Sequence, residues 1–380
     1  MQPPANRDAS TYPPGRGEAA YPQYCAQPPS PPRVMSPNVT GLRLEAIFAL
    51  DRKWLNGTVI HYYFFDRPTD GTTVVLSNGQ KEFRSWVGDN DQREVVRRAF
   101  KTWKELGIGL EFVEVNSRTE AEVRIGFMLG DGSYSAVGTD VLKRGSGERT
   151  MNFGWRLVGS QGHDTALHEI GHTLGLEHEH QNPFAGIVWN EEAVYTTLAA
   201  PPNNWDREKT HWNIIRKISP NEVQGSSWDA NSIMHYPFGP GLIRSPHPFD
   251  ATGVRPAGGL SERDKTWVRT FYPPQTPSAF PTLGAGLSQF LPTHNGDQQD
   301  FVVRPEATRK YNIGTFGSCD SIVALFEEEN GNPRFITADD DSGEDRNARL
   351  RVKLLKGRKY IVRAQVRFVD LTSPPFIMMW

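Results

Sequence analysis

The sequence predicts an α+β domain followed by a small β-sandwich. Three observations predict this class: strands around one amphipathic helix in the first part, a HExxHxxGxxH motif at 168–178, and short alternating strands after the proline-rich break at 273–277. At 380 residues the chain is long enough for two domains and a tail. The expected boundaries are a disordered proline-rich tail at 1–43, the α+β domain at 44–274, a linker at 275–286 and the sandwich at 287–380.

The first domain is expected to begin with a strand at 58–65, where β-branched and aromatic residues are concentrated. Apolar residues then recur at helical spacing within 91–106, and Gly107 ends that helix. Further strands are expected at 110–115 and at 121–127, where apolar and polar residues alternate. The later part of this domain is rich in loops. Three of its tryptophans are expected in the core or the cleft wall: Trp205, Trp212 and Trp228.

The motif at 168–178 is the strongest functional signal in the chain. On a helix, His168 and His172 project from nearly the same face one turn apart, so both can bind one metal ion. Gly175 allows the chain to leave the helix through a left-handed turn, which brings His178 toward the same point. Three neutral imidazoles leave one ligand position open, which is typical of a catalytic Zn²⁺ site.

Glu169 lies between the first two histidines and points to the side of the expected metal. It is therefore the candidate general base that takes a proton from a zinc-activated water. Leu167, Ile170 and Leu174 recur at helical spacing, so one face of this helix is expected to be buried while the histidines face a cleft. Asp164 precedes the apolar run and is the expected N-cap.

The motif and a downstream methionine turn resemble the metzincin clan of zinc endopeptidases and, within it, the astacin family. The turn at 232–236 reads SIMHY and lies about 55 residues beyond His178. Glu179 directly follows the third histidine, and the turn places Tyr236 two residues after Met234, both as in astacins. Weaker similarities at 132–138, 260–264 and 271–273 extend the resemblance over roughly residues 44–274.

The resemblance implies a zincin-like domain with a twisted mixed sheet, an active-site helix and a loop-rich lower part. It also implies hydrolysis of peptide bonds in proteins, with Glu169 as the base. Tyr236 is then a fifth zinc ligand in the resting enzyme and an oxyanion donor during turnover; the alternative is an ordinary buried tyrosine. A substrate strand is expected to pair with an edge strand, supplied either by 121–127 or by 134–137.

The cysteines mark a departure from the family. The chain contains only Cys25 and Cys319, both outside the catalytic domain, so it cannot form the disulfides that animal astacins carry there. The propeptide motif of the family is also not evident. Cys25 is either a thiolate that caps the zinc in a latent form or an inert thiol in a disordered tail. We favour the inert thiol, because nothing around Cys25 matches a known switch.

The last part of the chain shows short alternating runs with turn signals between them, which favours a β-sandwich. The expected strands are 300–303, 311–313, 322–326, 350–354 and 360–364. This part resembles the bacterial pre-peptidase C-terminal domain. Its acidic cluster offers oxygen ligands for Ca²⁺ or forms a solvated turn, and we favour the turn because the spacing matches no EF-hand loop. The cluster comprises Asp339, Asp340, Asp341 and Asp345.

Composition limits the classes of partner. The net charge of −2 provides no global field for nucleic acid or an anionic membrane, and no run of about 18 apolar residues is present to span a bilayer. We therefore expect no nucleic-acid partner and no membrane span. The resemblance implies protein or peptide substrates, and we expect a monomer. The N-terminus lacks the apolar core of a signal peptide, whereas the resemblance implies secretion. The alternative function is a surface- or polysaccharide-binding protein in which the sandwich is the main actor and the metal site is auxiliary.

Overall fold

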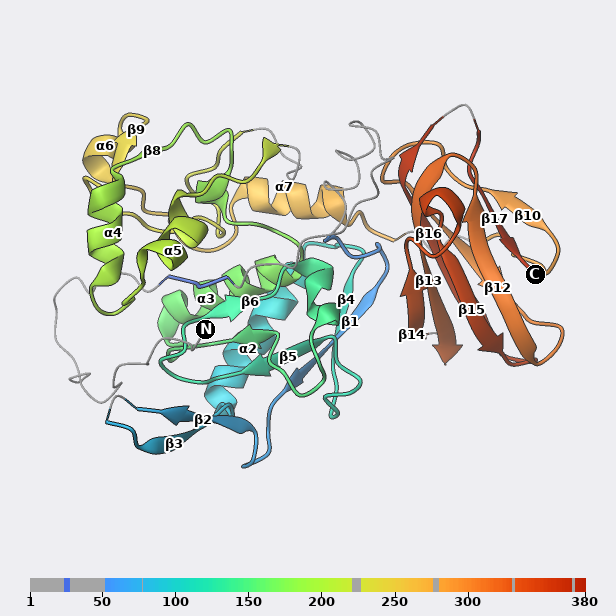
Figure 1. The fold of residues 1–380 in the computed structure, drawn as a ribbon, viewed down its shortest axis with the longest axis horizontal. Coiled ribbons are helices and arrows are strands. Elements are labelled where there is room, and N and C mark those ends of the chain that lie inside the picture. Colours follow the sequence, from blue (N-terminus) through green and yellow to red (C-terminus); the bar gives the residue numbers. More distant parts are fainter. Residues whose placement is uncertain are drawn as a thin grey trace.

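The computed structural model describes residues 24–27, 52–76, 78–220, 227–275, 280–329, 332–370 and 373–380. Figure 1 shows a mixed domain of helices and strands beside a second domain built of strands. The predicted α+β class and the C-terminal sandwich are therefore confirmed. No helix in these ranges is long and apolar enough to cross a membrane.

The first domain is built on a five-stranded sheet with the order β4-β1-β5-β7-β6. Its central strands β1, β5 and β7 run parallel, and β6 is antiparallel to β7 at one edge. The bounds are β1 Val59–Phe64, β4 Glu111–Glu114, β5 Val123–Gly126, β6 Tyr134–Ser135 and β7 Met151–Asn152. A separate hairpin, β2 Gly71–Val75 and β3 Lys81–Ser85, was not predicted. Most of its residues are exposed, so it lacks the apolar alternation of a half-buried strand.

The position of β5 decides between the two expected edge strands. β5 lies between β1 and β7, and all four of its residues are buried. The prediction that 121–127 could supply the substrate edge is therefore wrong. The alternative at 134–137 contains β6, which is an edge strand of the sheet.

Helix α2, Asn90–Lys104, agrees with the predicted helix at 91–106. Asp89 caps its start by accepting a hydrogen bond from the Gln92 amide at 3.0 Å. Trp103 is fully buried on this helix, and its indole Nε1 donates to the Leu167 carbonyl of helix α3, Gly159–Thr173, at 3.1 Å. The two helices therefore pack together with a fixed register.

The predicted N-cap of α3 is wrong. The helix begins at Gly159, and Asp164 lies inside it, where its carboxylate accepts a hydrogen bond from the Gly259 amide at 2.9 Å. The helix extends further back than its apolar run because Gly162 packs directly on the backbone of Leu157. A Cβ atom on Gly162 would lie 2.4 Å from the Leu157 carbonyl carbon.

Short elements and loops form the part of the first domain that follows α3. Figure 1 shows them above α3 and α2, on the side opposite the β2–β3 hairpin. Their bounds are β8 Val188–Trp189, α4 Glu191–Ala199, α5 Arg207–Thr210, β9 Ile243–Ser245, α6 Phe249–Thr252 and α7 Glu262–Phe271. This loop-rich organisation is the one that the resemblance implied.

The second domain is a sandwich of two four-stranded antiparallel sheets, with the orders β10-β17-β12-β15 and β11-β16-β13-β14. All five expected strands are present, and β10, β14 and β17 were missed. The bounds are β10 Ser288–Phe290, β11 Gln298–Val303, β12 Arg309–Phe316, β13 Cys319–Glu329, β14 Asn332–Asp339, β15 Arg349–Leu354, β16 Tyr360–Val369 and β17 Phe376–Met379. Buried side chains from both sheets form one core between them.

The sandwich begins earlier than predicted. The expected linker extended to residue 286, but the Val302 amide donates to the Pro281 carbonyl at 2.9 Å, and the Leu283 amide donates to the Val302 carbonyl at 2.9 Å. Leu283 is fully buried in the sandwich core. Residues 281–286, although rich in glycine, are therefore part of the sandwich and not of a free linker.

The two domains share an apolar contact. Leu55, at the start of the first domain, lies in one buried cluster with Ala324, Phe326 and Ile361 of the sandwich. The Gln298 side-chain amide also donates to the Asn56 carbonyl at 2.7 Å, across the same boundary. The sandwich is therefore packed against the first domain.

The acidic cluster of the sandwich is engaged by donors from the protein. Asp339 accepts hydrogen bonds from the Ser342 amide at 3.0 Å and the Arg349 amide at 2.8 Å. Asp340 pairs with Arg367 at 3.3 Å. Among the described residues, this turn contains no convergent group of three metal-ligating side chains. These contacts favour the solvated turn, and binding of Ca²⁺ stays a prediction.

Candidate metal centre

Helix α3 and the turn after it bring three histidines to one point. His168 and His172 come from the helix, and Gly175, with φ of +88°, turns the chain so that His178 faces them. The Nε2 atoms of His172 and His178 are 3.0 Å apart. The ligand atoms of the three histidines and of Cys25 all lie within 4.8 Å of one another. Four residues thus form a compact, buried group.

The outer nitrogens of two of these rings fix their orientation. His168 Nδ1 is 2.8 Å from the Ile233 carbonyl, and His172 Nδ1 is 2.8 Å from the Leu176 carbonyl. Only a protonated Nδ1 can donate to a carbonyl, so both Nε2 lone pairs point inward. His168 Nε2 is buried and has no hydrogen-bond partner in the described structure. A metal ion at this point would be bound by that inward lone pair.

The donor set fits zinc. Nitrogen ligands in tetrahedral zinc sites are about 2.0–2.1 Å from the ion and therefore about 3.3 Å from each other. The Nε2 atoms of His172 and His178 are 3.0 Å apart, which is close to this separation. Burial lowers the pKa of His168 to about 3 and that of His172 to about 4. Both rings are therefore neutral at physiological pH, the form that binds a metal.

The methionine turn, 232–236, packs directly against helix α3. A Cβ atom on Gly171 would be 2.4 Å from Met234 Sδ, so the turn approaches the helix where no side chain intervenes. Asp264, at the start of α7, accepts hydrogen bonds from Ser232 Oγ at 2.6 Å and from the Ile233 amide at 2.8 Å. These hydrogen bonds attach the methionine turn to α7. Sequence reasoning missed this role of Asp264, because it depends on a contact between distant segments.

Aromatic donors secure the buried end of α3. Trp54 Nε1 donates to the Thr173 carbonyl at 2.7 Å, and the Tyr272 hydroxyl donates to the Leu174 carbonyl at 2.8 Å. The last carbonyls of a helix have no partner within it, and here both are buried away from water. These bonds fix the helix end from which the chain turns toward His178.

Glu169 and Tyr236 lie at the edge of the histidine group. Glu169 is buried, and burial raises the pKa of its carboxyl group well above the usual range. The Tyr236 hydroxyl oxygen is 2.6 Å from His178 Nε2, and the hydroxyl donates to the Cys25 carbonyl at 2.8 Å. The structure therefore places both predicted residues within reach of a ligand at the metal position.

Cys25 is not an inert thiol in a disordered tail, so the interpretation favoured from the sequence is wrong. Its side chain is buried, with Sγ 3.5 Å from Glu169 Oε2 and 3.7 Å from His172 Nε2. It occupies the position that the three histidines leave open. A single cysteine in a proline-rich stretch has no periodic pattern around it, and this explains why the sequence did not reveal its position.

Residues 24–27 run along the edge of the sheet next to the metal centre. The Ala26 amide donates to the Ser133 carbonyl, just before β6, at 3.0 Å. The Gln27 side-chain amide donates to Glu177 Oε2 at 3.2 Å. The expected disorder of the tail is therefore wrong for these four residues; the rest of 1–43 lies outside the described ranges.

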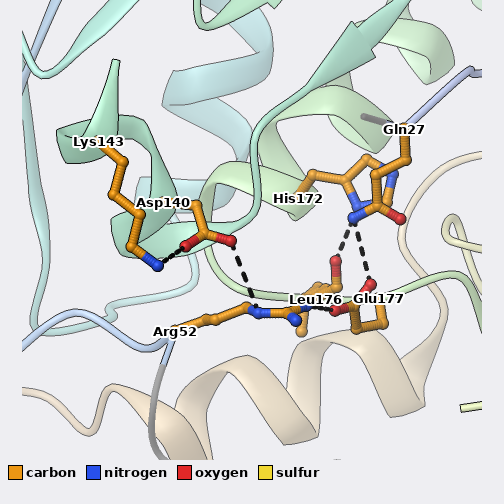
Figure 2. A network of polar contacts seen from close by, with 7 residues as sticks. All are labelled: Gln27, Arg52, Asp140, Lys143, His172, Leu176 and Glu177. Atoms are coloured by element: carbon orange, nitrogen blue, oxygen red, sulfur yellow. Dashed lines mark hydrogen bonds and ion pairs between the residues drawn. The ribbon is translucent and has the colours of Figure 1, made fainter. Parts of the chain in front are cut away.

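Glu177 links this segment to a chain of charges. Figure 2 shows contacts that run from Lys143 through Asp140 and Arg52 to Glu177 and Gln27. Lys143 is 2.6 Å from Asp140, Arg52 is 3.6 Å from the same carboxylate, and Arg52 also pairs with Glu177. Figure 2 also shows His172 in contact with the Leu176 carbonyl, beside Glu177. The chain of charges therefore reaches Glu177, which lies between Leu176, the contact of His172, and His178.

Glu179 connects the third histidine to the methionine turn. Its amide donates to the Met234 carbonyl at 3.0 Å, and its Oε1 accepts from the Asp229 amide at 2.8 Å and the Asn182 side chain at 3.1 Å. Burial raises the pKa of Glu179 to about 7. Glu179 therefore connects the segment after His178 to Asn182, to Asp229 and to the methionine turn.

Comparison with known proteins agrees with this geometry. The family model for the astacin peptidase family matches residues 82–239. Zinc metalloproteinase nas-26 of Caenorhabditis elegans is 28% identical over 160 residues, which cover 40% of this chain and 34% of that protein. A structure of myroilysin is 30% identical with a TM-score of 0.50, and the match covers 60% of this chain and 98% of the other. The chain thus spans about a third of the length of the first curated relative but nearly all of myroilysin.

Fold and site together define a metzincin metallopeptidase domain. The chain belongs to the astacin family. For the sandwich, the pre-peptidase C-terminal domain of a Bacillus anthracis collagenase matches at 12% identity with a TM-score of 0.22, over 28% of this chain and 99% of that domain. The alternative of a binding protein with an auxiliary metal site is not favoured by these findings.

Proposed function

We propose that this protein is a zinc-dependent endopeptidase that hydrolyses peptide bonds in proteins. The observation that supports it most directly is the convergence of His168, His172 and His178 on one buried point, with Glu169 beside it. The three histidines would hold the ion. When bound, zinc acts as a Lewis acid that makes a water ligand acidic and polarises a carbonyl group.

The side chains around the ion divide the remaining work. Glu169 accepts a proton from the attacking water and passes it to the leaving amine, because its carboxylate lies on the open side of the histidine group. The Tyr236 hydroxyl donates to the oxyanion that develops on the scissile carbonyl. The edge strand β6 pairs with the substrate backbone.

A digest of a peptide library by the purified protein tests this function, with and without a zinc chelator. We expect cleavage inside peptides that stops on chelation and returns when zinc is added. Metal analysis of the same sample should give about one zinc ion per chain. Absence of cleavage after activation, or cleavage that persists without metal, would contradict the proposal.

Tyr236→Phe is expected to lower kcat about 100-fold and to leave zinc content nearly unchanged. Removal of one oxyanion donor typically has an effect of this size, whereas three histidines still bind the ion. Tyr195→Phe on α4 is a matched control, because its hydroxyl is exposed and lies 3.4 Å from His211 Nδ1. Unchanged turnover in Tyr236→Phe would exclude the tyrosine as a donor.

We also propose that the conformation with Cys25 at the metal centre is a latent form of the enzyme. Its thiol occupies the ligand position that water needs, and residues 24–27 lie beside β6, where a substrate strand is expected. Zinc would deprotonate a thiol that binds to it, whereas burial alone raises the pKa of Cys25. We also propose that the protein acts outside the cell, as the resemblance implies, and that it is a monomer.

A further inference from the structure

Tyr24 occupies an aromatic pocket beside the metal centre. Its side chain is only 4% exposed. Its ring centroid is 5.1 Å from that of Tyr236, 5.7 Å from that of Phe238 and 6.3 Å from that of Trp205. The planes of Tyr24 and Phe238 are nearly parallel, at 20°. We call the space between Trp205, Tyr236 and Phe238 the Tyr24 pocket.

The end of the Tyr24 pocket is polar. The Tyr24 hydroxyl donates to the Pro237 carbonyl at 2.9 Å. Burial raises the pKa of this hydroxyl, so it remains a neutral donor at physiological pH. A phenylalanine ring would fill the same space and leave the carbonyl without this donor. A charged side chain would lose its hydration among three aromatic rings. The contacts of this pocket therefore match those that a phenol side chain can make.

The main chain of residues 24–26 makes hydrogen bonds that do not involve the side chains of these residues. The Tyr24 amide donates to Asn203 Oδ1 at 3.2 Å. The Cys25 carbonyl accepts from the Tyr236 hydroxyl at 2.8 Å, and the Ala26 amide donates to the Ser133 carbonyl at 3.0 Å. Main-chain contacts along an extended segment, with one side chain in a pocket, are how proteases and sheet edges bind extended peptides.

We propose that the Tyr24 pocket is a substrate subsite that selects tyrosine, and then other aromatic side chains, within two residues of the scissile bond. This inference rests on the proposed peptidase function and adds a substrate class to it. Release of residues 24–27 would leave Trp205 and Phe238 facing an empty space next to Tyr236. A peptide that reaches the catalytic residues along the same path places a side chain there.

Cleavage profiling of the activated full-length protein tests the subsite. A peptide library should show tyrosine enriched at one fixed position within two residues of the cleaved bond. We expect tyrosine to be preferred over phenylalanine about fivefold and over alanine about 50-fold in kcat/KM, as expected for one hydrogen bond and one buried ring. Equal use of all residues at these positions, or enrichment of charged ones, would overturn the proposal.

A parallel casein digest distinguishes a failure of the subsite proposal from a failure of the proposed peptidase function. If casein is cleaved and no aromatic preference is found, the subsite is wrong and the peptidase function stands. If neither casein nor the library is cleaved by the zinc-loaded, activated protein, the function fails and the subsite falls with it.

A pair of tryptophan variants locates the preference in the structure. Trp205→Ala should lower kcat/KM about tenfold for a tyrosine peptide and less than about twofold for its alanine analogue. Trp212→Ala is the matched control, since Trp212 packs on Arg216 rather than on Tyr24; it should change both substrates equally. An equal loss on both substrates in Trp205→Ala would place the preference elsewhere. If Trp205→Ala does not fold, the wild-type profile still decides.

Discussion

Glu169→Gln is expected to lower peptide hydrolysis about 1,000-fold while zinc content and fold are retained. Loss of a general base commonly costs about 100- to 10,000-fold. Glutamine has the same size and cannot accept the proton, and it introduces no new charge into a buried position. Glu169 is only 1% exposed, and burial already disfavours its charged form, so the variant is not expected to be less stable.

The effect of Glu169→Gln is best measured in protein that carries Cys25→Ser, so that latency does not hide it. Glu192→Gln is a matched control, because Glu192 is an exposed residue of α4 paired with Arg207. Metal analysis and a thermal melt should give the same values for both variants. A Glu169→Gln protein that cleaves at the unmodified rate would exclude the base assignment.

Cys25→Ser is expected to raise the basal hydrolysis of the full-length protein at least tenfold. The thiol lies within 4.8 Å of all three histidine ligand atoms, and a serine hydroxyl is a much poorer zinc ligand. Loss of about 1.4 kcal/mol of capping free energy shifts the population of open sites about tenfold. The three histidines still bind the ion, so zinc content should be unchanged.

The matched control for Cys25→Ser is Cys319→Ser. Cys319 is also buried, but it lies in the sandwich, where its thiol is 2.9 Å from Asn347 Oδ1. Its replacement should leave the basal rate unaltered. Alkylation of the unmodified protein should activate it, and the same reagent should have no further effect on Cys25→Ser. Equal basal rates in wild-type protein and Cys25→Ser would show that the thiol does not cap the metal.

The parts of the site that could be predicted are those encoded within one local segment. His168, Glu169 and His172 share one helix, and His178 follows after a single glycine turn, so spacing alone brings them together. Tyr236 could be assigned only through the family resemblance, because it comes from a separate turn. The class of each domain was also accessible, since strand and helix periodicities are local properties.

The parts that could not be predicted depend on tertiary contacts. Cys25 reaches the metal centre because Tyr24 has an aromatic pocket, and neither fact leaves a pattern in the tail. Asp264 supports the methionine turn from a distant helix. Asp164 resembles a cap by composition, but the packing of Gly162 on Leu157 moves the helix start to Gly159. The alternation at 121–127 suggested a half-exposed strand, but all four residues of β5 are buried and the strand lies between β1 and β7.

The contact of Leu55 with the sandwich is expected to couple the unfolding of the two domains. Leu55 lies in the shared cluster, and the adjacent Trp54 donates to the end of α3. Separation of the domains would expose this apolar cluster to water and loosen the segment that secures the helix end. Heating should therefore give one cooperative transition for both domains, and ligands of the metal centre should raise the melting temperature of the sandwich as well.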